Sequence, residues 1–95
     1  IIESGELTTP AFITQACEDA LLGGADFIKT STGKVPVGAT PEAVQVILAT
    51  LKACPRTVGL KISGGIRSIA QAQSYIDLTT KNMGADFIHP KTFRI

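Results

Sequence analysis

The sequence repeats one five-residue phrase, Gly-Ala-Asp-Phe-Ile, which occupies residues 24–28 and returns at residues 84–88. A third short apolar run lies between the two copies at residues 57–62, and residues 1–3 read like the tail of a further strand. Each run is followed by a polar or glycine-bearing loop, which is typical of buried parallel strands. We therefore expect four strands, each separated from the next by a helix.

The three stretches between these runs have the residues that typically begin helices. Thr9 and Thr40 each precede a proline, which is favoured at the first helical position, and Ser68 forms a predicted capping box with Gln71. Apolar residues recur at helical spacing, as Ile13, Ala16, Cys17, Ala20 and Leu21, then Val44, Ile47, Leu48 and Leu51, then a looser set of Ile69, Ala72, Ile76 and Met83.

Strands that alternate with helices predict an α/β fold with a parallel sheet and right-handed crossovers. Two architectures fit, an open doubly wound sheet and an arc of a TIM (β/α)8 barrel, and periodicity does not separate them. A whole barrel takes about 250 residues, so residues 1–95 would form about half of one, as part of a single domain. Half a barrel leaves two sheet edges unpaired, so we expect a homo-oligomer or a chain of marginal stability.

Composition excludes several classes of function. A net charge of +1 lacks the lysine and arginine surplus that nucleic acid or an anionic membrane requires. No apolar run reaches the roughly 18 residues of a spanning helix, and no secretory signal opens the chain, so a cytoplasmic protein is expected. We interpret Cys17 and Cys54 as reduced apolar residues, and the single histidine, His89, as structural or pocket-lining. No metal site is expected.

Two lysines end predicted strands. Lys29 follows the first copy of the repeat, and Lys61 lies within the run at residues 57–62. Ligands gather at the carboxyl ends of parallel strands, and alternation turns both lysines away from the helix side. A lone lysine there would usually extend its ammonium to water. A second ammonium in a partly desolvated pocket disfavours the charged form of the first, so the pair suits a lysine nucleophile whose neighbour handles protons.

The loops after these two strands suit an anion. Backbone N–H groups of a glycine-rich turn beside the positive end of a helix can bind phosphate, and nearby cations add charge-assisted bonds. The candidate phosphate ligands are Thr32, Gly33, Lys34, Gly64, Gly65 and Arg67. A tight turn without any ligand explains the paired glycines equally well. The first loop is not a Walker A motif, because the earlier glycine is missing.

Three stretches resemble the deoxyribose-phosphate aldolase family. They are residues 2–7 (Ile-Glu-Ser-Gly-Glu-Leu), 25–33 (Ala-Asp-Phe-Ile-Lys-Thr-Ser-Thr-Gly) and 59–67 (Gly-Leu-Lys-Ile-Ser-Gly-Gly-Ile-Arg). Residues 92–95 further resemble the run before the last phosphate loop of the family. The resemblance runs through the whole chain in order, and the stretch around Lys29 is its most specific part.

The resemblance implies a TIM-barrel lyase of nucleotide catabolism that uses no metal or other cofactor. Such an enzyme reversibly cleaves 2-deoxy-D-ribose 5-phosphate to D-glyceraldehyde 3-phosphate and acetaldehyde. Lys29 falls on the Schiff-base lysine of the family, and Lys61 falls on the second lysine, which supports proton transfer. The glycines and cations of the two loops fall on the positions that receive the substrate phosphate. The strands would be the fifth to the eighth of the barrel.

Some parts of the family pattern are not found among these residues. They are an aspartate proton shuttle on an earlier strand, a Gly-x-Ser-Ser loop expected after Ile95, and a C-terminal tail with a tyrosine. We therefore interpret the sequence as part of a longer protein, and we expect little turnover from these 95 residues alone. Two other hypotheses remain open: a phosphosugar-binding barrel enzyme that forms no imine, and a non-catalytic phosphate-binding half barrel.

Overall fold

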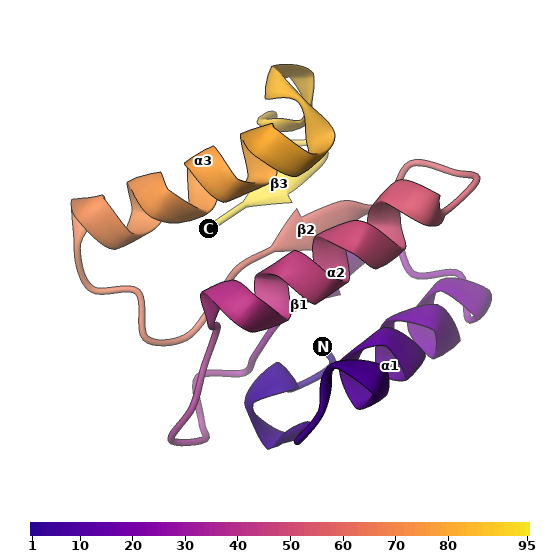
Figure 1. The fold of residues 1–95 in the computed structure, drawn as a ribbon, viewed down its shortest axis with the longest axis horizontal. Helices are drawn as coiled ribbons and strands as arrows, with labels where there is room; N and C mark the ends of the chain where they lie inside the picture. Colours follow the sequence, from indigo (N-terminus) through magenta and orange to yellow (C-terminus); the bar gives the residue numbers. More distant parts are fainter.

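Three short parallel strands form one sheet in the computed structural model, which describes residues 1–95 (Figure 1). Across the sheet they are β1 (Phe27–Lys29), β2 (Gly59–Lys61) and β3 (Phe93–Arg94). The helices are α1 (Pro10–Leu22), α2 (Pro41–Ala53) and α3 (Ile69–Met83), with short 3-10 helices η1 (Ser4–Glu6) and η2 (Ala85–Phe87). In Figure 1, α2 lies between α1 and α3 in a helix layer that covers one face of the sheet. The predicted α/β fold is confirmed.

The predicted side-chain caps begin all three helices. In each helix the cap hydroxyl accepts the N–H three positions later at 3.1 or 3.2 Å, and the caps are Thr9, Thr40 and Ser68. The return bond of the predicted capping box is displaced by one residue, because Gln71 accepts the N–H of Arg67 at 2.8 Å and not that of Ser68. Each such cap stabilises a helix by about 1 kcal/mol. None of the helices combines the length and the apolarity needed to cross a membrane.

The core lies between the sheet and the helix layer, with β2 and α2 at its centre. Leu60 and Ile62 are fully buried, and Val58 is 2% exposed. The predicted stripe of α2 is buried in full, as Val44, Ile47, Leu48 and Leu51. Alternate residues of β2 therefore point into the core, as the sequence predicted, because successive strand side chains face opposite ways.

The stripe predicted for α3 is only partly right. Ile69, expected to be apolar core, is 88% exposed, because it is the first helical residue and lies beyond the sheet. The side chains that α3 buries are Tyr75 and Thr79, while Ala72 and Ile76 are half-buried beside them. A tyrosine and a threonine replace the expected aliphatic residues, which explains why the sequence pattern was weak here.

The second copy of the repeat is not a strand, so that prediction is wrong. Residues 85–87 form η2, in which the N–H of Phe87 donates to the Gly84 carbonyl at 3.3 Å. Thr92 then donates its hydroxyl to the Phe87 carbonyl at 2.6 Å, which occupies a group that a strand would use for pairing. Pro90 has no N–H to offer a neighbouring strand. The chain therefore turns, and β3 begins only at Phe93.

Residues 1–3, expected to end a strand, lie beside β1 without forming a regular ladder. The N–H of Ile2 donates to the Lys29 carbonyl at 3.1 Å, and the N–H of Ser4 donates to the Thr30 carbonyl at 2.8 Å. Between them Glu3 adopts a left-handed conformation, with φ 51° and ψ 58°. Regular pairing stops there, so the structure has three strands where four were predicted.

Truncation of the central core side chain Leu48, which is fully buried, should cost about 2–5 kcal/mol of unfolding free energy in Leu48→Ala. The matched control is Leu22→Ala, since Leu22 is 88% exposed, and it should change stability by less than about 0.5 kcal/mol. Urea unfolding followed by circular dichroism measures both. Equal losses in the two variants would show that the core is placed wrongly.

Cys17 is fully buried on α1 and is a free thiol. Burial, with a smaller contribution from the Glu18 carboxylate, raises the pKa of the Cys17 thiol from 9.0 to about 11. The unfolded chain releases this proton near pH 9, whereas the folded chain keeps it. Because the folded state then binds more protons, stability is fully present below pH 9 and falls as pH rises toward 11.

Between pH 8 and pH 11, the free energy of unfolding should therefore fall less in Cys17→Ala than in the parent chain. A shift of two pKa units corresponds to roughly 2–3 kcal/mol. Urea unfolding at several pH values gives the two slopes, and Cys54→Ala, at a half-buried free thiol, is the control. Identical slopes in Cys17→Ala and the parent would contradict the assignment.

Candidate active site

Lys29 and Lys61 lie side by side at the carboxyl ends of β1 and β2. The parallel register pairs them directly, and neighbouring strands lie about 4.8 Å apart. Ile28 and Leu60, which precede them, are buried toward the helices at 1% and 0% exposure. Both lysines therefore project from the opposite face of the sheet, which no helix covers (Figure 1). The structure brings together the two amines that the sequence singled out.

A third cation, Arg94, continues this row on β3. Arg94 is the register partner of Lys61, and Phe93 before it is buried, so Arg94 stands on the lysine face. Its guanidinium carbon lies 4.4 Å from the centroid of the Phe27 ring. The ring fills the space above Gly59, where an added Cβ would lie 2.5 Å from ring carbon Cε1. The sequence analysis missed Arg94, because it expected the last strand at residues 84–88 and none at residues 93–94.

The loops that follow β1 and β2 are joined by hydrogen bonds close to the lysines. The fully buried Thr30 hydroxyl donates to the Ser63 carbonyl and accepts the Ser63 N–H, both at 3.0 Å. Further along the first loop, the N–H of Ala39 donates to the carbonyls of Ser63 and Gly64, at 3.1 and 3.2 Å. The two loops therefore form one layer above the sheet.

Two glycines let these loops approach each other at backbone distance. A Cβ added to Gly38 would lie 2.5 Å from the carbonyl oxygen of Gly64. Gly64 and Gly65 have φ values of +90° and +78°, a region that residues with side chains avoid. The paired glycines therefore serve a tight turn and a close contact, whether or not that turn also binds an anion.

A cavity of about 410 Å³ opens beside this turn. It is lined by Lys61, Ile62, Ser63, Gly64, Gly65, Ile66 and Ile95. One predicted catalytic lysine and both glycines of the predicted phosphate turn thus border a single space. The cavity is where a small ligand can reach the lysine and the turn together.

The other predicted phosphate ligands do not line this cavity. Thr32, Gly33 and Lys34 are exposed in the loop after β1, and Gly33 has a φ of +83°. Arg67 is exposed just before α3, and its backbone N–H donates to the Gln71 side chain at 2.8 Å. These residues lie on the two loops that leave β1 and β2.

His89, which follows the second repeat as Lys29 follows the first, lies at the other end of the sheet. It precedes β3, and its Nδ1 accepts the N–H of Lys91 at 3.2 Å. Its carbonyl accepts the N–H groups of Thr92 and Phe93 at 2.8 and 2.7 Å. His89 therefore shapes the turn into β3 and lies away from the lysines.

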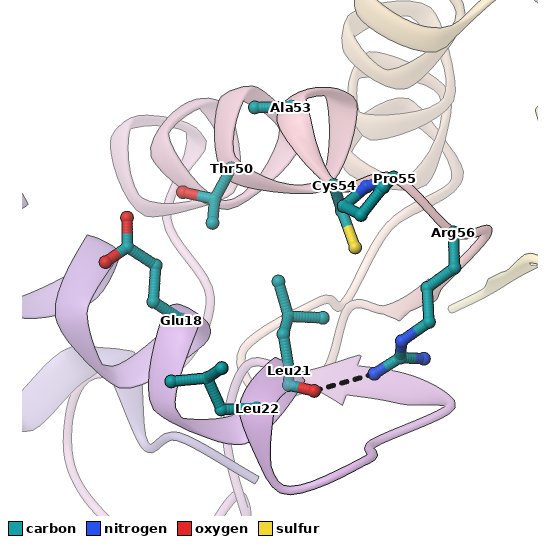
Figure 2. A pocket seen from close by; sticks show the side chains of 8 residues that line it. All are labelled: Glu18, Leu21, Leu22, Thr50, Ala53, Cys54, Pro55 and Arg56. Atoms are coloured by element: carbon teal, nitrogen blue, oxygen red, sulfur yellow. Dashed lines mark hydrogen bonds between the residues drawn. The ribbon is translucent and has the colours of Figure 1, made fainter.

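The largest cavity also lies at the amino ends of the strands, between the C-terminal ends of α1 and α2 (Figure 2). It measures about 430 Å³ and is lined by Glu18, Leu21, Leu22, Thr50, Ala53, Cys54, Pro55 and Arg56. Arg56 bounds it by donating to the carbonyls of Leu21 and Ala25, both at 2.8 Å. No predicted site residue borders it, so we assign the active site to the carboxyl ends of the strands.

Comparison with known proteins identifies the family. A family model described as DeoC/LacD family aldolase matches residues 2–87. The chain belongs to the DeoC/LacD aldolase family. A Toxoplasma gondii ME49 protein assigned as a deoxyribose-phosphate aldolase is 28% identical with a TM-score of 0.87, and an apo form is 32% identical with a TM-score of 0.86. The aldolase QR15 is 34% identical with a TM-score of 0.72.

These structures cover 97%, 94% and 92% of this DeoC/LacD-family chain, in the same order. The chain spans only 38%, 35% and 41% of their length. Its sheet and helices therefore form part of an aldolase barrel, which confirms the predicted barrel architecture and distinguishes it from an open doubly wound sheet. The predicted family is confirmed as well.

A side chain at Gly38 should separate the two site loops, because the Gly64 backbone occupies its space. We expect Gly38→Ala to destabilise the fold by about 1–3 kcal/mol and to shift the amide NMR signals of residues 63–65. Gly23→Ala is the control, since its Cβ would lie 3.4 Å from the nearest atom, the Ala20 carbonyl oxygen. Unchanged signals at residues 63–65 in Gly38→Ala would refute the close contact.

Proposed function

We propose that the protein is a class I aldolase that reversibly cleaves 2-deoxy-D-ribose 5-phosphate to D-glyceraldehyde 3-phosphate and acetaldehyde. Lys29 is the Schiff-base nucleophile in this proposal. The observation that carries it is the direct pairing of Lys29 with Lys61 at the strand ends, on the face free of helices. The family match and the T. gondii structures support the substrate class.

The proposed reaction uses Lys29 as a temporary electron sink. Its neutral amine attacks the C1 aldehyde of the open-chain sugar, and loss of water gives a protonated imine. The imine draws in the electron pair of the C2–C3 bond as the C3 hydroxyl loses its proton, which releases glyceraldehyde 3-phosphate. Protonation of the resulting enamine at C2, followed by addition of water, releases acetaldehyde and free Lys29. No metal or organic cofactor is needed, because the imine itself withdraws the electrons.

Lys61 is the proton-handling partner in this scheme. It ends the neighbouring strand at the same level as Lys29, and it also lines the cavity beside the glycine turn. In that place the ammonium of Lys61 can donate a proton to the departing water, and the neutral amine that this leaves can take a proton back from the water that hydrolyses the imine. Arg94, the next cation in the row, holds the Phe27 ring in place beneath the lysines.

The substrate phosphate is proposed to lie at the turn formed by Gly64 and Gly65. This turn precedes the N-terminus of α3, where free N–H groups and the helix dipole favour an anion. Lys34 and Arg67 supply cations from the two hydrogen-bonded loops. Lys61 borders the same cavity as the turn, so a sugar held there by its phosphate extends toward the lysine pair.

Borohydride reduction tests the proposed nucleophile. With acetaldehyde present, reduction should leave a stable ethyl group on Lys29, found by peptide mapping, and Lys29→Arg should lose it. Lys91→Arg, at an exposed lysine before β3, is the control and should be modified at Lys29 like the parent. Trapping is preferred to turnover because the chain spans 35% to 41% of the aldolases it matches.

An unmodified Lys29 peptide in the parent chain would contradict the Schiff base. Sugar phosphate binding without any adduct would instead support a barrel enzyme that forms no imine. For Lys61→Met, we expect trapping at Lys29 to slow by about 10²-fold or more, the usual range for loss of an acid–base group.

A further inference from the structure

We propose that Glu3 is a positioning residue whose carboxylate holds residues 32–34 in the shape that receives the substrate phosphate. The inference rests on the proposed function, since it assigns a support to the phosphate loop of that same site. Glu3 precedes the loop by 29 residues in the sequence and meets it only through the fold.

Both oxygens of the Glu3 carboxylate are bound by Thr32. The N–H of Thr32 donates to Oε1 at 3.1 Å, and its hydroxyl donates to Oε2 at 2.6 Å. The hydroxyl oxygen in turn accepts the N–H of Lys34 at 3.1 Å. Two charge-assisted hydrogen bonds from Thr32 to Glu3, and a further hydrogen bond from Lys34 to Thr32, thus hold the loop on both sides of Gly33.

This arrangement decides which groups of the loop can meet an anion. The N–H and the hydroxyl hydrogen of Thr32 are both used by Glu3, and the N–H of Lys34 is used by Thr32. The donors that remain for a phosphate are the Gly33 N–H and the Lys34 ammonium. Thr32, which the sequence predicted as a phosphate ligand, therefore belongs to the support of the loop.

The backbone of Glu3 is held in place beside β1. Glu3 is the only residue other than glycine with a positive φ, a conformation that costs energy and persists only where neighbours enforce it. The neighbours here are Ile2 and Ser4, which donate to the carbonyls of Lys29 and Thr30. Glu3 is therefore fixed against β1, and its carboxylate meets the loop that leaves that strand.

A carboxylate near a phosphate site would repel the ligand if its charge faced that ligand. Here both oxygens accept hydrogen bonds from Thr32, so the carboxylate faces the loop. A carboxylate suits this place better than an amide, because it has two acceptors and no donor. Glu3→Gln therefore keeps the shape of the side chain but sets an amide N–H against one of the Thr32 donors.

Phosphate titration of the 95-residue chain, labelled with ¹⁵N, tests the proposal. We expect inorganic phosphate to shift the Gly33 amide in the parent chain and to bind about tenfold more weakly in Glu3→Gln, the effect of one lost charged hydrogen bond. Exchange of the Thr32 amide with solvent should also become faster. Glu6→Gln is the matched control, because Glu6 is exposed on the adjoining η1 turn.

Borohydride trapping of Lys29 gives a second readout. The ratio of trapping rates for 2-deoxyribose 5-phosphate over 2-deoxyribose should fall about tenfold in Glu3→Gln, since only the first sugar uses the loop. A merely structural loss would lower both rates and leave their ratio unchanged.

Equal phosphate affinity in Glu3→Gln and the parent, or no shift at Gly33 in the parent, would overturn the proposal even with normal trapping of Lys29. Failure of the parent to trap Lys29 with either sugar would count against the proposed function, while the phosphate titration still decides the role of Glu3. If Glu3→Gln does not fold, Thr32→Val takes its place, since it replaces the hydroxyl with a methyl group. It must show the same weakening of phosphate binding, and unchanged affinity there would overturn the proposal too.

Discussion

The register between β1 and β2 determines where the two candidate site lysines lie. Lys29 pairs with Lys61, and the N–H of Thr30 donates to the Lys61 carbonyl at 3.0 Å just beyond that pair. A slip of one residue would turn one lysine into the helix layer, because strand side chains alternate. The burial of Ile28 and Leu60 prevents such a slip. The apolar contacts that stabilise the sheet therefore also keep the two amines together.

Most of the fold could be predicted from short-range sequence patterns. Thr9, Thr40 and Ser68 cap helices through bonds to residues three positions away, so short sequence patterns were sufficient to place the helix starts. The strand predicted at the second copy of the repeat does not form, because that copy has the same residues but different surroundings. Thr92 and Pro90, outside the repeat, turn residues 85–87 into a 3-10 helix. A strand depends on its partners, and five residues do not encode them.

The site was predictable to the extent that it follows from strand alternation. Lys29 and Lys61 could be placed on one face from the sequence, whereas Arg94 could not, because the last strand was expected at residues 84–88 and forms at residues 93–94. Glu3 could not be found in this way, because its bonds to Thr32 depend on how distant segments meet. The bonds of Thr32 to Glu3 were missed for the same reason, since nothing in the neighbourhood of Thr32 along the chain indicates them.

The contact between Gly38 and Gly64 has a consequence for any redesign of the two loops. A Cβ on Gly64 would lie 3.0 Å from the Cα of Gly38, so neither loop can gain a side chain there without displacing the other. A graft that replaces one loop must therefore bring its counterpart with it. A substitution has more freedom at Ile66, which borders the cavity and is only half-buried.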